Sequence, residues 1–210
     1  LMRAGKGAKH WQLVPPKGWR TSYRRTSLSR WITDTQCGAG ELLARVIVNR
    51  LWQHHIGRGI VATPNDFGVQ GQRPTHPDLL DWLATQFRER GWDVKAMHRL
   101  IVTSATYRQS SQISPDSNPQ HAKALIVDVS NDLLWRQWRK RLEAEAIRDA
   151  MLVVSQQLNP QMHGPSVKPQ LPIGISKRYA WQADEAVENQ WRRSIYVFVK
   201  RNMRYPLFDA

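Results

Sequence analysis

The sequence predicts a mainly α fold, an irregular helical domain with long loops and one or two short strands near the C-terminus. Three observations lead to this class. Apolar residues recur at helical spacing over 41–55, 76–90 and 141–158. Proline and glycine interrupt the chain between such stretches, as they do over 159–180. Alternation of β-branched and aromatic residues, which is typical of a strand, is confined to "RRSIYVFVKR" at 192–201.

The first part of the chain has no helical periodicity. Residues 1–26 are rich in Lys, Arg, Gly and Pro, which indicates a basic extended arm. A short helix is expected over 27–33, with Ser27 as its N-cap. From residue 27 to residue 210 we expect a single, mostly helical domain that is truncated at its C-terminus.

Capping residues set the limits of the central helices. Thr75 is expected to cap the helix over 76–90, and Gly91 should end it. Asp93 can cap a further helix. The polar stretch 109–119 contains two prolines and is expected to form a loop.

The chain is strongly basic. Its 210 residues carry 31 Lys and Arg against 17 Asp and Glu, a formal charge of +14. Residues 1–40 hold eight of the bases and one acid, so half of the excess, +7, lies in the first fifth of the chain. A basic arm can bind phosphates or other anionic surfaces, although a solvated extension is the commoner meaning of such a segment.

Composition excludes several classes of protein. The single cysteine, Cys37, allows no internal disulfide and no all-cysteine metal cage, and we interpret it as an incidental thiol. No stretch approaches the roughly 18 apolar residues that span a membrane. Ten tryptophans argue against disorder, and we expect most of them in the core because Trp82 and Trp135 lie in apolar runs.

The paired histidines His54 and His55 lie in the last turn of the 41–55 helix, which Gly57 and Gly59 should stop. At about 100° per residue both flank the apolar arc around Leu51, which favours structural histidines over metal ligands or catalytic bases. The opposite face is expected to be solvated and consists of Glu41, Arg45, Asn49 and Gln53.

The helix expected over 141–158 contains one carboxylate in an unexpected position. On a helical wheel Glu143 falls within the apolar arc, whereas Arg148 and Asp149 fall on the charged side. Glu143 is therefore predicted to be buried. A buried charge must be paired, neutralised or bound to a metal, so an ion pair with an arginine is the favoured explanation and a general base or metal ligand is the alternative.

Asp66 completes the set of candidate site residues. With Asn65 it lies in a loop, where capping of a turn through its side chain is favoured over catalysis. His98 falls at the edge of an apolar arc. The P-loop, GxGxxG, GxSxG and CxxC motifs are missing, as is CxxCH, so we expect no covalent haem and no other cofactor in this chain.

Several long motifs resemble one protein family. They are "ARVIVNRLWQHHIGRGIVATPNDFGVQGQRPTHPDLLDWLATQFRERGWDVKAMHRLIVTSATYRQSS" at 44–111, "LLWRQWRKRLEAEAIRDAML" at 133–152, "HGPSV" at 163–167 and "RRSIYVFVKRNMRYPLFDA" at 192–210. They resemble the planctomycete PSD domain, also called domain of unknown function 1553. In "HGPSV", His163 stands where the family leads us to expect glycine.

The resemblance implies a setting rather than a reaction. It implies an extracytoplasmic location, periplasmic or secreted, in a bacterial multidomain protein whose other domains would be the partners of this chain. It also implies that an upstream module carries haem c and that the parent protein takes part in polysaccharide metabolism. The chain ends where family members continue, so we expect it to be a fragment, and we find no signal peptide in it.

Three functions follow as hypotheses. The first is a module of unknown function in a secreted protein, with polysaccharide as a partner. The second is a metal- or acid/base-dependent enzyme that uses Glu143 with His54 or His55. The third is binding of nucleic acid or another anionic polymer through the basic arm, and of these two polymers nucleic acid is the less expected.

Overall fold

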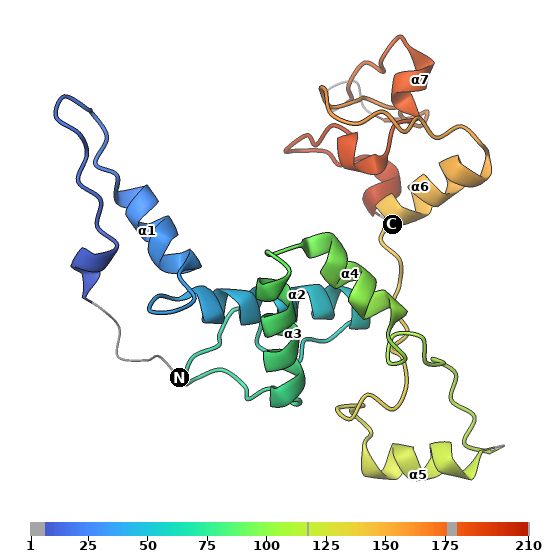
Figure 1. The fold of residues 1–210 in the computed structure, drawn as a ribbon. Helices are drawn as coiled ribbons and strands as arrows, with labels where there is room; N and C mark the ends of the chain where they lie inside the picture. The colour runs from blue at the N-terminus through green and yellow to red at the C-terminus, as the bar shows by residue number, and fades with distance from the viewer. Residues whose placement is uncertain (1–6, 117, 176–179, 210) are drawn as a thin grey trace. The chain divides into compact units, whose positions relative to one another are not determined.

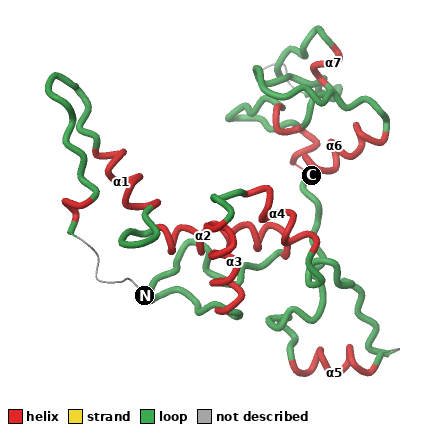
Figure 2. Tube along the Cα trace, viewed as in Figure 1, coloured by secondary structure: helices red, strands yellow, loops and turns green. Residues whose placement is uncertain are grey.

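The computed structural model describes residues 7–116, 118–175 and 180–209. Figures 1 and 2 show short helices joined by long loops, and the mainly helical class is confirmed. The chain divides into two compact units, the first ending at Arg139 and the second beginning at Lys140. That residues 27–210 fold as one cooperative domain stays a prediction, and each unit is described by itself. None of the described helices is long and apolar enough to cross a membrane.

The first unit is built around one long helix. This is α2 (Gly40–Ile56), close to the range expected from the sequence, and α3 (Pro77–Glu89) and α4 (Val94–Thr103) pack against it. Gly57 ends α2 at a φ of 103°, a backbone conformation that favours glycine. The remaining helices of the unit are α1 (Arg24–Thr33), α5 (Pro119–Val127) and the 3-10 helix η1 (Ala8–His10). No helix was predicted from the sequence at the position of α5.

A single apolar core holds the three central helices together. Phe87 of α3 meets Trp92 edge to face, with ring centroids 5.2 Å apart. Trp52 of α2 is buried, but Trp82 is 50% exposed, so its prediction as a core residue was wrong. The buried members of the core are Ala44, Val48, Trp52, Ile56, Ile60, Val61, Leu80, Leu83, Ala84, Phe87, Met97 and Ile101.

Asn49 corrects the expected faces of α2. It was placed on the solvated side, yet it is completely buried. Its side-chain nitrogen donates to the carbonyl of Val61 at 2.9 Å, and its oxygen accepts from the Val61 amide at 2.8 Å. A Cβ on Gly59 would lie 2.6 Å from the Val61 oxygen, so Gly59 permits this close approach as well as following the helix end.

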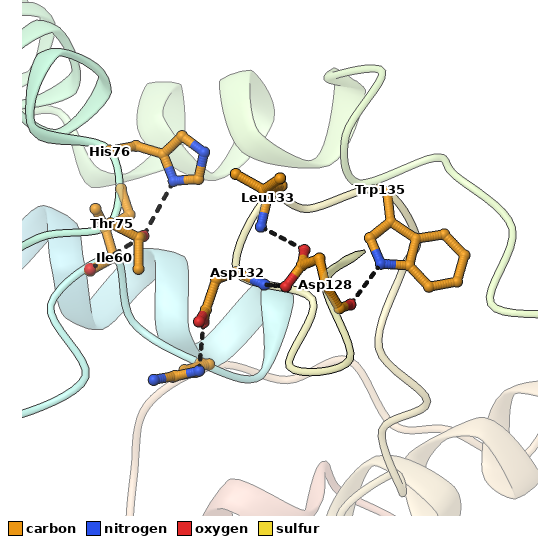
Figure 3. Close-up of polar contacts among 8 residues, drawn as sticks. Ile60, Thr75, His76, Asp128, Asp132, Leu133 and Trp135 are labelled. Atoms are coloured by element: carbon orange, nitrogen blue, oxygen red, sulfur yellow. Dashed lines mark hydrogen bonds and ion pairs between the residues drawn. The ribbon is translucent and has the colours of Figure 1, made fainter. Parts of the chain in front are cut away.

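Two of the expected N-caps were wrong. The hydroxyl of Ser27, inside α1, donates back to the carbonyl of Tyr23. The hydroxyl of Thr75 donates to the carbonyl of Ile60, as Figure 3 shows, instead of capping α3. In both cases a nearby acceptor satisfies the hydroxyl better than the helix start does. Asp93 does cap α4, since its carboxylate accepts from the amide of Ala96.

A tight turn follows α5. Figure 3 shows the Asp128 carboxylate accepting from the amides of Asp132 and Leu133, while the Asp128 carbonyl accepts from the indole of Trp135. Asp132 in turn forms an ion pair with Arg58, just beyond α2, at 2.6 Å. The turn is therefore joined to the end of the longest helix of its unit.

The second unit has little apolar core. It contains α6 (Ala144–Val154), α7 (Val187–Gln190) and the 3-10 helices η2 (Ser194–Tyr196) and η3 (Pro206–Asp209). Among its described residues the buried apolar side chains are Val167, Pro169 and Val197, and Val167 and Val197 join in a parallel bridge. The strand expected over 192–201 is reduced to η2 and isolated bridges.

Arg192 takes the place of an apolar core residue in this unit. Its exposure is 2%, and its guanidinium donates to the carbonyls of Gln161, His163 and Pro165 while lying 4.0 Å from the ring centroid of Tyr196. His163 itself has a φ of 64°. Glycine, which the resemblance led us to expect at this position, adopts this left-handed conformation more readily than histidine does.

Candidate functional site

The candidate residues belong to different units. Glu143 lies in the second unit, and His54, His55 and Asp66 lie in the first. The structure brings His55 beside His98 and places Glu143 on a cleft of its own unit. A shared site of Glu143 with His54 or His55 stays a prediction.

Glu143 is exposed, so the prediction of a buried carboxylate was wrong. The helix begins one residue later, at Ala144, and Glu143 is its N-cap with an extended backbone at ψ 146°. A helical wheel that includes residue 143 therefore assigns its side chain to the wrong face. The expected apolar face is also exposed, because Ile147 is 39% and Val154 83% accessible.

Arg148 is the buried charge of α6. Its side chain is 8% exposed. One guanidinium nitrogen, Nη1, donates to the carbonyl of Arg192 at 2.9 Å and to the hydroxyl of Ser194 at 3.2 Å, and Nη2 donates to the carbonyl of Gln190 at 2.6 Å. These three bonds fix α6 against the segment that leads into η2.

Asp149, the next residue, binds the same segment. Its Oδ1 accepts from the amide of Ser194 at 2.7 Å, and its Oδ2 lies 3.6 Å from the guanidinium of Arg193. A charge-assisted bond from a carboxylate to a backbone amide is among the stronger hydrogen bonds. Arg148 and Asp149 together therefore set the distance between α6 and η2.

The space between these elements is a cleft of about 680 Å³, which we call the α6 cleft. Such a volume is within the range of about 300–1,000 Å³ that is usual for small-molecule sites. Carboxylates come from α6 and the residue before it, a guanidinium and apolar side chains come from η2 and the residues beside it, and a second guanidinium and two aromatic rings come from η3 and the two residues before it. Its lining consists of Glu143, Glu145, Ala146, Asp149, Arg193, Ser194, Ile195, Val197, Phe198, Val199, Arg204, Tyr205 and Phe208.

The aromatic side of the α6 cleft is held in place by ring contacts. Tyr205 stacks on Trp181 with an interplanar angle of 21° and meets Phe208 edge to face at 5.3 Å. Trp181 is anchored in turn, since its indole donates to the carbonyl of Pro169 at 2.8 Å. Aromatic side chains with few rotatable bonds, locked in this way, present a preformed surface to a ligand.

The histidines of the first unit form a different cluster. His55 Nε2 lies 2.7 Å from His98 Nδ1, so one ring donates a proton that the other accepts. Tyr107 meets His55 edge to face at 5.9 Å. His55 is partly buried, and His54 is exposed rather than turned to the apolar side as expected. The pair joins α2 to α4.

Asp66 stabilises a turn, as favoured from the sequence. Its Oδ1 accepts from the amide of Gly68 at 2.8 Å, and its carbonyl accepts from the hydroxyl of Thr63. Over the parts of the chain that the structure describes, no group of three or more His, Cys, Asp or Glu side chains is placed to hold a metal ion.

Sequence reasoning found one residue of the α6 cleft and missed most of the others. Arg193 lies in a stretch interpreted as a strand, while Arg204, Tyr205 and Phe208 were noted only as part of a family motif. The signal that could have located them is the alternation of arginine and aromatic residues over 192–208. It carries no spacing rule that would distinguish a binding surface from a strand.

Comparison with known proteins agrees with the motifs. A family model, PSD1, described as protein of unknown function (DUF1553), matches residues 24–210. No curated protein and no solved structure matches the chain. The α6 cleft lies entirely within the matched range.

Proposed function

The chain belongs to the PSD1 family, proteins of unknown function (DUF1553), and on that premise we propose that its second unit binds a neutral saccharide in the α6 cleft. One observation carries this proposal. Carboxylate acceptors, guanidinium donors and aromatic faces converge on one cleft of ligand size. The proposed setting is extracytoplasmic polysaccharide metabolism, beside other domains of the parent protein.

The chemistry of a sugar ring suits this lining. Its hydroxyl groups both donate and accept, so they can pair with carboxylates such as Glu143 and with guanidiniums such as Arg204. Its C–H groups can rest on the negative face of an aromatic ring such as Tyr205. A ligand that is only apolar would leave the charged groups without partners.

The charge of the α6 cleft favours a neutral ligand over an acidic one. Three carboxylates, of Glu143, Glu145 and Asp149, face the guanidiniums of Arg193 and Arg204, and Asp149 also lies 3.9 Å from the guanidinium of Arg148. Carboxylates and guanidiniums are therefore equal in number, and no excess of positive charge attracts a carboxylated or sulfated sugar. Glu143 is also exposed, which favours hydrogen bonding to a ligand over proton transfer in a desolvated site.

Calorimetric titration of the full chain with a panel of neutral oligosaccharides tests the proposal. We expect binding by at least one of them, weakened about tenfold by Glu143→Gln, because a hydrogen bond to a charged group contributes about 1.5 kcal/mol or more. Glu185→Gln is the matched control, since it removes the same charge from an exposed residue of the same unit outside the cleft. No binding, or equal weakening by both variants, would contradict the proposal.

A further inference from the structure

A second hollow lies in the first unit, between the arm and α1. It has a volume of about 560 Å³, and we call it the arm groove. Figure 1 shows the blue segment running out to a turn and returning to enter α1, so that the arm lies along the helix. The groove is lined by Trp11, Gln12, Leu13, Ser22, Arg24, Ser27, Leu28 and Trp31.

Hydrogen bonds hold the arm against α1. The amide of Leu13 donates to the hydroxyl of Ser27 at 3.0 Å, and the indole of Trp11 donates to Asp34 Oδ2 at 2.8 Å. Bonds from the backbone amide of Cys37, the indole of Trp11 and the backbone amide of Gln36 lower the pKa of Asp34 to about 2, so this anchor stays ionised at neutral pH. These hydrogen bonds therefore hold the walls of the groove in place.

The segment that forms the groove is strongly positive. Residues 7–34 contain six Lys and Arg and one acidic residue, Asp34. The carboxylate of Asp34 accepts bonds from the indole and the backbone amides and keeps its single negative charge, which the six bases outnumber. The six cations are Lys9, Lys17, Arg20, Arg24, Arg25 and Arg30. Such a field attracts anionic ligands.

The lining of the groove distinguishes between classes of anionic polymer. Its polar groups are hydroxyls and an amide, from Ser22, Ser27 and Gln12, with Arg24 as the single cation. Nucleic-acid surfaces instead place a row of cations along closely spaced phosphates. A chain that carries hydroxyl groups beside its acidic groups fits this lining better. Trp31, 37% exposed, offers an indole face to a sugar ring.

We propose that the arm groove binds an acidic polysaccharide, whose sugar rings lie on Trp31 and whose carboxylate or sulfate groups meet Arg24 and are attracted by the other cations of residues 7–34. This site is independent of the α6 cleft, because its residues lie in the other unit and its ligand is acidic rather than neutral. Neither proposal depends on the other.

Binding of the full chain to heparin and to polygalacturonate tests the proposal, with dextran and single-stranded DNA as comparison ligands. We expect both acidic polysaccharides to bind, dextran not to bind at this groove, and DNA to bind more weakly at the same ionic strength. Affinity should fall with added salt, and Arg24→Gln should reduce the slope of log affinity against log salt by about one. Arg73→Gln, in an exposed loop, should reduce the slope less.

A pair of tryptophan variants separates groove binding from general attraction to a basic protein. Trp31→Ala should weaken heparin binding about tenfold, a loss in the range of stacking on one aromatic side chain. Trp82→Ala removes another exposed indole of the same unit and should change the affinity less than about twofold. Equal effects of the two variants, or tighter binding of DNA than of both polysaccharides, would overturn the proposal. If Trp31→Ala does not fold, the salt dependence of Arg24→Gln still tests the proposal, because Arg24 is exposed and its substitution should leave the fold intact.

Discussion

Replacement of Arg148 by methionine should destabilise the second unit. The methionine keeps most of the apolar stem but removes the guanidinium. Three acceptors, the carbonyls of Gln190 and Arg192 and the hydroxyl of Ser194, then lose their donor. Because this unit has few buried apolar side chains, we expect the polar contact to account for much of its stability.

The size of the effect follows from these three bonds. A buried acceptor left without a partner costs about 1–3 kcal/mol. Carbonyl and hydroxyl oxygens near the surface can recover part of this from water, so we take the lower value for each. The expected loss is about 3 kcal/mol, which corresponds to about a hundredfold change in the opening equilibrium of the unit.

Hydrogen exchange measured by mass spectrometry on the full chain is the suitable assay, because it reports on the second unit separately. The amides of Val167 and Phe198, which bond to Tyr196 and Val167, should exchange about a hundredfold faster in Arg148→Met. Arg201→Met, an exposed arginine of the same unit, should leave them within about threefold. Unchanged protection in Arg148→Met would refute the structural role given to this arginine.

Two further predictions concern the first unit. Asn49→Ala leaves the buried amide and carbonyl of Val61 unpaired and should lower the free energy of unfolding by about 2–4 kcal/mol in urea titration, whereas a loss below about 1 kcal/mol would contradict the paired bonds. The pKa of Asp34 falls from 3.8 to about 2 in the folded chain, so its anchoring of Trp11 should persist above pH 4 and weaken as the pH falls toward 2. The NMR chemical shift of the Trp11 indole proton should follow this titration, and its pH dependence should disappear in Asp34→Asn. A titration that survives the substitution would exclude Asp34 as its source.

Local signals in the sequence predicted the limits of some helices, although the caps expected at Ser27 and Thr75 were wrong. The limits of α2 follow from its periodicity and from Gly57, and Asp93 begins α4 as expected. The Asp66 turn was also favoured from the sequence, because the bond from a side chain to an amide two residues later is a local property.

The errors come from contacts distant in sequence. Asn49 and Arg148 were assigned to solvated faces because polar residues usually lie there. Both are buried by partners that lie 12 residues away for Asn49 and more than 40 residues away for Arg148. A helical wheel cannot foresee these partners. The wheel also failed at Glu143, since a shift of the helix start by a few residues changes which side chains belong to the helix at all.

The α6 cleft could not be predicted from the sequence for the same reason, because it depends on contacts between residues distant in sequence. Its walls come from α6, from the segment around η2 and from η3, which are joined only through the bonds of Arg148 and Asp149. The sequence therefore indicated one residue of the cleft, Glu143, for a reason that was wrong, namely its burial.

Mapping of a neutral oligosaccharide onto the chain by amide chemical shifts is the most direct test of the proposed function. Titration of the isotopically labelled full chain should perturb amides on both walls of the α6 cleft, including those of Glu145, Ser194 and Tyr205, with one saturating dependence on ligand concentration. Shifts confined to the first unit, or no shifts with any neutral sugar of the panel, would contradict the account.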